Sequence, residues 1–162
     1  MQKISPCLSF DNEAEEAARF YVSIFKNSKI GKILRLTESS AKAIGRKKGA
    51  VLTVTFTING LDFMALNGGP EFKFNQGISL MAHCKTQKEL DTVWKKLTAG
   101  GGKELQCGWL KDKYGLSWQI VPNDIEKMIE DKDPKKSDRV LQAVWSMVKL
   151  DIAALRRAYK GS

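Results

Sequence analysis

The sequence predicts an α+β fold made of two βαβββ modules followed by a helical extension. Three observations lead to this prediction. Strand and helix patterns follow the order βαβββ over residues 1–67, a similar order recurs over residues 77–122, and residues 123–162 have helical periodicity with no strand pattern. Residues 68–76 are predicted to be the linker between the modules. A chain of 162 residues can bury a core without a disulfide or a structural metal.

The first module begins with an alternating strand over residues 3–10. Pro6 favours an edge position or a bend there because proline has no N–H to donate. Asn12 is expected to cap a helix with a buried stripe of residues spaced by three and four. That stripe consists of Ala14, Ala17, Ala18, Tyr21, Ile24 and Phe25.

Three further strands complete the first module. Strands are predicted over residues 30–37 and 51–58, joined by a basic loop. Asn59-Gly60 then predicts a tight hairpin into a strand over residues 61–66, since both residues tolerate positive φ.

The second module restarts after Gly68-Gly69-Pro70. A strand over residues 78–84 precedes a helix over residues 86–98, in which Thr86 and Glu89 form a capping box.

Three glycines, residues 100–102, stop that helix, and extended segments follow at residues 104–110 and 116–121. Residues 115–118 (GLSW) repeat the pattern of residues 60–63 (GLDF). This similarity supports two copies of one unit.

The C-terminal residues are expected to form helices. A short helix carries Ile125, Met128 and Ile129, Asp133-Pro134 interrupts it, and Ser137 is predicted to cap the next helix. A heptad-like seam then follows through Leu141, Trp145, Val148, Ile152, Leu155 and Tyr159. This seam is either one rod or two helices, the second capped by Asp151. It packs either on its own sheet or on a second subunit.

Charge and cysteine content narrow the function classes. The net charge is +9, but residues 26–48 alone carry +7, so the charge is a local basic segment and not a general nucleic-acid surface. That segment is either a solvated hairpin or a clamp for an anionic ligand. Three widely spaced cysteines favour reduced thiols and a cytoplasmic location. No apolar run is long enough to span a membrane and no secretory leader is expected.

Residues 107–122, CGWLKDKYGLSWQIVP, make a resemblance specific. With the linker GGPEFKFN and the ending KLDIAAL, they resemble the PhnB-like branch of the vicinal oxygen chelate superfamily, often labelled 3-demethylubiquinone-9 3-methyltransferase-like. That superfamily includes glyoxalase I, extradiol dioxygenases, and fosfomycin and bleomycin resistance proteins. The resemblance implies a curved mixed sheet of about eight strands around a cleft, usually completed in a homodimer.

Members of this superfamily that use a metal place His, Glu or Gln ligands on the first and last strands of each module. The corresponding positions here are Ser5 or Pro6, Ala65 or Asn67, Ile78, and Gln119. These positions offer at best neutral oxygens, and the single histidine, His83, lies five residues beyond Ile78. We therefore expect no catalytic metal and no cofactor.

The expected function is binding of a small organic molecule in the sheet cleft. Apolar groups would line it and a few polar groups would orient the ligand. These candidate ligand-binding residues are Met64, Asn67, Phe72, Phe74, Asn75, Ser79, Trp109, Trp118 and Gln119. No catalytic residue is assigned, and neither nucleic acid nor membrane is expected as a partner. The alternative is a metal-dependent lyase, isomerase or dioxygenase of the same superfamily, or a drug-sequestering resistance protein.

The methyltransferase reaction named in the family label is not expected. Binding of S-adenosylmethionine usually needs a glycine-rich turn that leads from a strand into a helix. The glycines at residues 100–102 instead follow a predicted helix and precede a strand.

Overall fold

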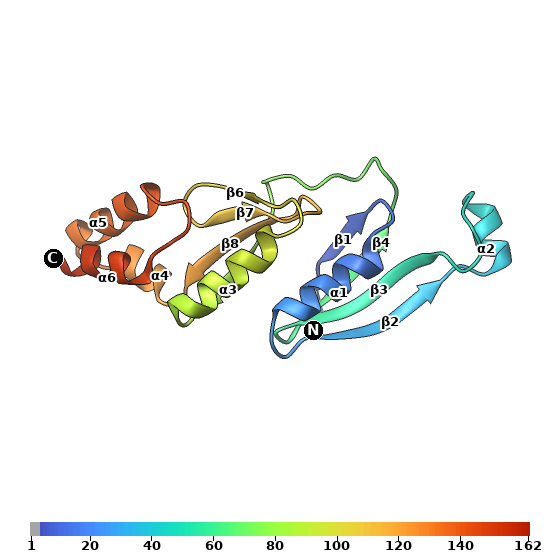
Figure 1. Cartoon of the computed structure of the whole chain (residues 1–162), viewed down its shortest axis with the longest axis horizontal. Helices are drawn as coiled ribbons and strands as arrows, with labels where there is room; N and C mark the ends of the chain where they lie inside the picture. Colours follow the sequence, from blue (N-terminus) through green and yellow to red (C-terminus); the bar gives the residue numbers. More distant parts are fainter. Residues whose placement is uncertain (1–3) are drawn as a thin grey trace. The chain divides into compact units, whose positions relative to one another are not determined.

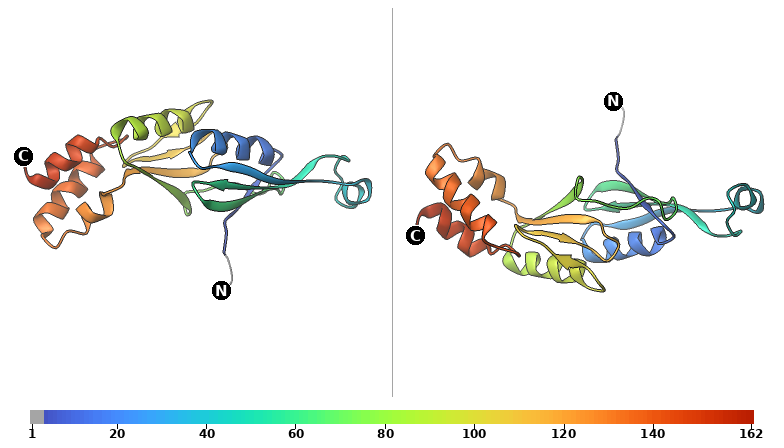
Figure 2. Two further views of the ribbon diagram at one scale, coloured as in Figure 1. Left: turned by 90° about the horizontal axis from the view of Figure 1, so that it is seen from below. Right: turned by 90° about the horizontal axis from the view of Figure 1, so that it is seen from above.

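The computed structural model describes residues 4–162 and divides them into two compact units, with the boundary between Lys73 and Phe74. Each unit contains a four-stranded mixed sheet with one helix lying along one of its faces (Figures 1 and 2). The α+β class with two βαβββ modules and C-terminal helices is therefore confirmed. The eight strands form two sheets of four.

The first unit follows the predicted order of elements, with one short helix added. Its elements are β1 (Cys7–Phe10), α1 (Ala14–Ile24), β2 (Lys29–Arg35), α2 (Glu38–Ala43), β3 (Val51–Ile58) and β4 (Leu61–Asn67). The strand order is β1-β4-β3-β2, with β1 parallel to β4 and the other neighbours antiparallel. This arrangement leaves β1 and β2 as the edge strands.

The core of the first unit lies between α1 and its sheet. Ala14, Ala17 and Ala18 are fully buried, and their small side chains let the helix approach the strands closely. Aromatic rings fill the remaining space: the ring centroids of Phe56 and Phe63 are 5.3 Å apart in a stacked arrangement. The predicted apolar stripe is therefore the buried face of α1 from Ala14 to Tyr21, whereas Ile24 and Phe25 are half-buried and Phe25 follows the last helical residue.

The start of α1 differs from the prediction. Its N-cap residue is Glu13, which makes no side-chain capping bond, and Asn12 does not cap the helix. The first helical N–H, that of Ala14, instead donates to Asn67 Oδ1 at 2.8 Å. The prediction of Asn12 was wrong because a residue 53 positions away satisfies this donor.

The basic loop also contains structure that the sequence pattern did not reveal. Helix α2 begins after Thr37, whose hydroxyl accepts a hydrogen bond from the N–H of Ser40, and Ala41 is buried. Figure 1 shows α2 at the far end of the β2–β3 hairpin of the first unit. The predicted first strand is also shorter and begins at Cys7, directly after Pro6.

The second unit repeats this topology and adds three helices. Its elements are β5 (Ser79–Cys84), α3 (Gln87–Thr98), β6 (Lys103–Glu104), β7 (Trp109–Lys111), β8 (Ser117–Pro122), α4 (Ile125–Ile129), α5 (Pro134–Trp145) and α6 (Ile152–Lys160). The strand order β5-β8-β7-β6 matches that of the first sheet, again with the first and last long strands parallel.

The capping box of α3 is present in part. Thr86 Oγ1 accepts from the N–H of Glu89 at 3.2 Å, as predicted, whereas the Glu89 carboxylate accepts from the N–H of Lys85. The buried stripe of α3 is Leu90, Val93, Trp94 and Leu97.

The predicted strand over residues 104–110 is divided into β6 and β7. Cys107 and Gly108 between them both have positive φ, and their N–H groups donate to the carbonyls of Met147 and Val148. The turn is therefore held by the segment that joins α5 to α6.

The C-terminal seam is two helices and not one rod. Asp151 caps α6 by accepting from the N–H of Ala154 at 2.7 Å. Helix α5 is capped by Asp133 with Pro134 in its first turn, so the prediction of Ser137 as the cap was wrong. The Ser137 hydroxyl donates instead to the carbonyl of Ile129.

The segment between α5 and α6 packs on the second unit of its own chain. The Gln87 side chain of α3 donates to the carbonyl of Leu150 and accepts from the N–H of Ile152. An ion pair of 2.6 Å joins Lys149 to Asp91 of α3. Across residues 4–162, no helix has the length and apolar character needed to cross a membrane.

Candidate functional site

The second sheet has one face covered by α3 and one face that α3 leaves open. Successive strand residues alternate between the faces, and Leu110, Trp118 and Ile120 are buried on the α3 side. Met81, Gln119 and Trp109 lie on the opposite side, which we call the open face. The register pairs Gln119 with both Met81 and Trp109. One row across three neighbouring strands therefore carries a thioether, an amide and an indole.

This row is accessible. Met81 is 47% exposed, and Gln119 and Trp109 are half-buried. Gln119 Nε2 donates to Ser79 Oγ at 2.9 Å, which orients the amide. Within residues 4–162, no hydrogen bond is donated to Gln119 Oε1, so this carbonyl can accept one from a ligand.

The linker residue Asn75 reaches the same sheet through its backbone. Its carbonyl oxygen lies 3.4 Å from Ser117 Oγ, and Ser117 is fully buried. The Asn75 side chain is used locally, since its Oδ1 accepts from the N–H of Gly77. This contact covers the start of β8 and leaves the row at Gln119 accessible.

Trp118 lies on the other face from Trp109. It is 2% exposed, and its indole N–H donates to Asp112 Oδ2 at 2.9 Å beneath α3. Asp112 Oδ1 accepts from the N–H groups of Tyr114 and Leu116. The segment 107–122 thus places Trp118 in the core and Trp109 on the open face.

The predicted residues of the first unit have separate environments. Met64 is 37% exposed on the face away from α1, between its register partners Cys7 and Thr55. Asn67 is buried and joins α1 to β3, because its amide also donates to the carbonyl of Val51 at 2.9 Å.

The two linker phenylalanines differ as well. Phe72 is 52% exposed and its ring lies against Gly68, where a Cβ atom would be 2.8 Å from the ring. Phe74 is half-buried at the start of the second unit. Of the nine predicted residues, the structure brings Ser79, Gln119 and Trp109 together.

Met81 completes this row, and the prediction omitted it. The repeated module in the sequence could have identified it. The first strand of the module pairs with the last, and this pairing places Met81 beside Gln119. His83, two residues farther on the same face, has Nδ1 3.7 Å from Glu126 Oε1.

The donors beside Gln119 do not fit a divalent metal, and farther along the same face His83 is next to a single carboxylate, that of Glu126. Ile78 precedes β5 and offers no donor, and Ser79 and Gln119 offer neutral oxygens, whereas such ions prefer carboxylates and imidazoles. Among the residues described, no group of three or more His, Cys, Asp or Glu is placed to hold an ion.

Cys84 is not placed to act as a nucleophile on this face. Burial raises the pKa of its thiol to about 12, with a smaller contribution from the Glu89 carboxylate. The side chain is buried and belongs to the α3 side of the sheet. It is a core residue.

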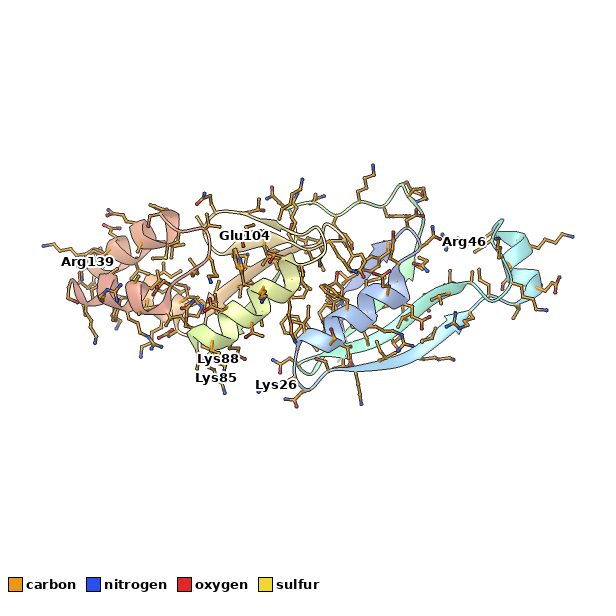
Figure 3. All side chains as sticks on the ribbon, viewed as in Figure 1. Lys26, Arg46, Lys85, Lys88, Glu104 and Arg139 are labelled. Atoms are coloured by element: carbon orange, nitrogen blue, oxygen red, sulfur yellow. The ribbon has the colours of Figure 1, made fainter. Side chains whose placement is uncertain are left out.

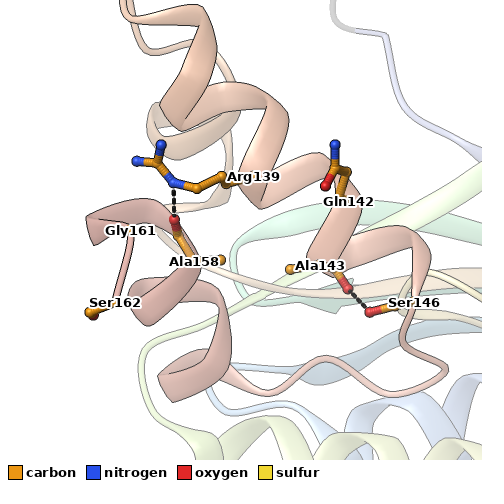
Figure 4. Close-up of a pocket in the computed structure, with 7 residues that line it drawn as sticks. All are labelled: Arg139, Gln142, Ala143, Ser146, Ala158, Gly161 and Ser162. Atoms are coloured by element: carbon orange, nitrogen blue, oxygen red, sulfur yellow. Dashed lines mark hydrogen bonds between the residues drawn. The ribbon is translucent and has the colours of Figure 1, made fainter.

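A hollow lies between α5 and α6, away from the row at Gln119, and Figure 4 shows its lining residues. The Arg139 guanidinium there donates to the carbonyls of Ala158 and Tyr159, at 2.7 and 3.0 Å. These carbonyls belong to the last turn of α6, where a cation is favoured by the helix dipole. Arg139 therefore caps α6 and joins the two helices.

Comparisons with known proteins agree with this architecture. Residues 2–121 match the family model described as 3-demethylubiquinone-9 3-methyltransferase. The solved PhnB protein from Bacillus cereus is 39% identical, with 74% of this chain and 99% of that chain covered and a TM-score of 0.65. No match was found among curated proteins.

More distant structures share the fold alone. A protein from Pseudomonas aeruginosa is 16% identical, with 75% of this chain and 98% of that chain covered and a TM-score of 0.58. A fosfomycin resistance protein from Listeria monocytogenes, solved with Mn(II) and sulfate, is 15% identical over 74% of this chain and 89% of that chain, with a TM-score of 0.53.

Proposed function

The chain belongs to the PhnB-like 3-demethylubiquinone-9 3-methyltransferase family, and on that premise we propose that it binds a small organic molecule on the open face of the second sheet. The observation that carries the proposal is the row of Met81, Gln119 and Trp109 across three strands. Ligand sites combine apolar surface with a few convergent polar groups. An indole and a thioether with one oriented amide between them have this character.

The test is quenching of tryptophan fluorescence by two probe ligands, fosfomycin and 2-naphthol. We expect at least one probe to quench the wild-type protein at saturable concentration. Trp109→Phe should remove most of the quenching. The matched control is Trp145→Phe, which removes an indole that is 64% exposed on α5 and should leave the titration unchanged. Quenching that survives in the Trp109 variant, or is absent with both probes, contradicts the proposal.

The proposal includes binding without a catalytic metal. Two features support binding without a metal. Ser79 and Gln119 offer only neutral donor atoms, and the Gln119 amide already donates a hydrogen bond to the Ser79 hydroxyl. Elemental analysis of the purified protein by mass spectrometry tests it. A stoichiometric transition metal that is lost on Gln119→Ala would favour the metal-dependent lyase, isomerase or dioxygenase instead.

We also propose that the family label does not describe the reaction. Residues 100–102 follow α3 and lead into β6, so the glycines form a helix C-terminus and not a strand-to-helix turn for S-adenosylmethionine. Calorimetric titration with S-adenosylmethionine should show no heat of binding. A micromolar dissociation constant would contradict this part of the proposal.

A homodimer is the proposed assembly. Exposed apolar side chains outside the row at Gln119 support it, notably Ile78 at 75% and Leu61 at 51%. Sedimentation velocity at micromolar concentration is expected to show a species of twice the chain mass. A single 18.1 kDa species would contradict the dimer.

A further inference from the structure

Two lysines stand directly opposite each other beside the row at Gln119. The antiparallel register of β6 and β7 pairs Lys103 with Lys111. Lys111 lies two residues from Trp109 along β7, so it points to the same face of the sheet. Cross-strand partners of this kind have Cβ atoms about 5 Å apart. The open face therefore carries two adjacent ammonium groups next to an indole.

No carboxylate neutralises this pair. Neither lysine takes part in an ion pair with any residue of the 4–162 region. Like charges directly opposite each other on a sheet are destabilising. Lys103 is exposed and Lys111 is half-buried, so two positive charges are held close together on this face.

The acidic residues nearest in sequence are committed to the opposite face. Glu104, which is labelled in Figure 3, follows Lys103, and its Oε1 accepts from Trp94 Nε1 of α3 at 2.6 Å. Asp112 follows Lys111 and is buried, with Trp118 Nε1 donating to its Oδ2. Strand alternation therefore places both acids on the α3 side and both lysines on the open face.

We propose that the ligand of the open face is a flat apolar or aromatic molecule that carries an anionic group, which Lys103 and Lys111 bind. This inference rests on the proposed function and specifies its ligand class. Residues two apart on a strand are separated by about 7 Å. A ring lying on Trp109 and Met81 therefore places a carboxylate or phosphonate substituent within reach of the two ammonium groups. Binding of the anion removes the repulsion between them.

A protective role for an edge lysine does not account for the pair. Lysine on an edge strand discourages pairing with another chain, and Lys103 on β6 fits that role. Lys111, however, is on β7, which has a hydrogen-bonded neighbour on each side. Protection of a sheet edge therefore does not explain the charge of Lys111.

The experiment compares three ligands that share one ring: 2-naphthoate, naphthalene-2-phosphonate and the uncharged 2-naphthamide. Binding is followed through the indole N–H signal of Trp109 in ¹⁵N spectra, assigned with Trp109→Phe. At low salt we expect at least one anion to bind about tenfold or more tightly than the amide, a difference of 1.4 kcal/mol. Comparison of the affinities for 2-naphthoate and naphthalene-2-phosphonate shows which anionic group is preferred.

The variant is Lys103→Gln with Lys111→Gln, and it should reduce anion affinity to that of 2-naphthamide while leaving amide binding unchanged. The matched control is Lys88→Gln with Lys95→Gln, which removes the same charge from exposed positions of α3. Lys111→Gln alone provides a milder variant, which should show part of the loss. Unchanged indole signals of the other tryptophans verify the fold.

The outcomes separate this inference from the function on which it rests. Equal affinity for all three ligands, or an anion preference that the double variant retains, overturns the inference and leaves the binding function standing. If none of the three ligands shifts the Trp109 signal, both are overturned.

Discussion

Asn67 shows that a residue predicted from the sequence to bind a ligand can have a structural role. Its amide satisfies the first N–H of α1 and the carbonyl of Val51 at the same time. Both partners lie in or beside the core of the first unit. A short amide at the end of β4 is therefore the connection between three elements.

We predict that Asn67→Ala lowers the free energy of unfolding by about 1–3 kcal/mol, because it leaves two polar backbone groups without their partner. Denaturant unfolding followed by circular dichroism measures this. Asn123→Ala, at an exposed position, should change the value by less than about 0.5 kcal/mol. A loss in Asn67→Ala no greater than in this control would mean that water replaces the amide.

Asp112 organises the turn inside the recognisable segment 107–122. Its carboxylate oxygens accept hydrogen bonds from the backbone N–H groups of Tyr114 and Leu116 and from the indole N–H of Trp118. Every one of these partners is a donor. The position therefore requires an acceptor at both oxygens.

Asp112→Asn is expected to destabilise the protein by about 1–3 kcal/mol, since the amide NH₂ would meet either a backbone N–H or the Trp118 N–H. The indole N–H signal of Trp118 should move in the variant. Asp138→Asn, at an exposed site on α5, is the matched control. Equal stability of the two variants would contradict this account of the turn.

Helix ends are the elements that local sequence described least well. Thr86 and Asp151 cap the helices that the pattern assigned to them, whereas α1 and α5 begin differently from the prediction. Asp133 combines a capping side chain with a following Pro134, which was interpreted only as a break. Proline in the first helical turn is favourable because its missing N–H has no intrahelical partner.

Asp133→Ala should cost about 1 kcal/mol, the usual effect of removing an N-cap. The measurement is the protection of α5 amides against hydrogen exchange, together with denaturant unfolding. Asp138→Ala removes the same charge within α5 without removing the cap. If both changes affect α5 equally, charge and not capping is responsible.

At the scale of the whole chain, the C-terminal extension is held to the second module by polar contacts with α3. The hydrogen bonds from Lys149 and Gln87 hold the pKa of the Asp91 carboxyl below its ordinary value. A carboxyl whose pKa is lowered by folding stabilises the fold above its unfolded pKa of about 3.9, and this contribution is lost as the pH falls through the lower, folded value.

We therefore expect the segment between α5 and α6 to lose hydrogen-exchange protection as the pH falls below about 4, the ordinary range of an aspartate pKa. In Asp91→Asn the same segment should already be less protected at neutral pH and should respond less to acid. Protection that falls equally in wild type and variant would assign the acid response to other carboxyls. The pair is partly exposed, so the effect is modest.

The family match ends at residue 121, so α4, α5 and α6 lie outside the matched residues. The fold nevertheless depends on them locally. The N–H groups of Cys107 and Gly108, in the turn that precedes Trp109, donate to carbonyls of the α5–α6 segment. The extension therefore supports the strand that presents Trp109 on the open face.

The sequence by itself determined the two modules, the order of their strands and helices along the chain, and most of the buried stripe of α1. These features follow from alternation, helical spacing and the hairpin signal at Asn59-Gly60, all of which depend on neighbours in the chain. Tertiary structure alone decided which donors are satisfied at a distance and which face each aromatic side chain occupies. Trp109 and Trp118 look equivalent in sequence, yet cross-strand register and the position of α3 place one on the open face and the other in the core. Whether a strand residue is buried depends on which elements pack against that face of the strand. The residues of the strand alone do not specify those elements.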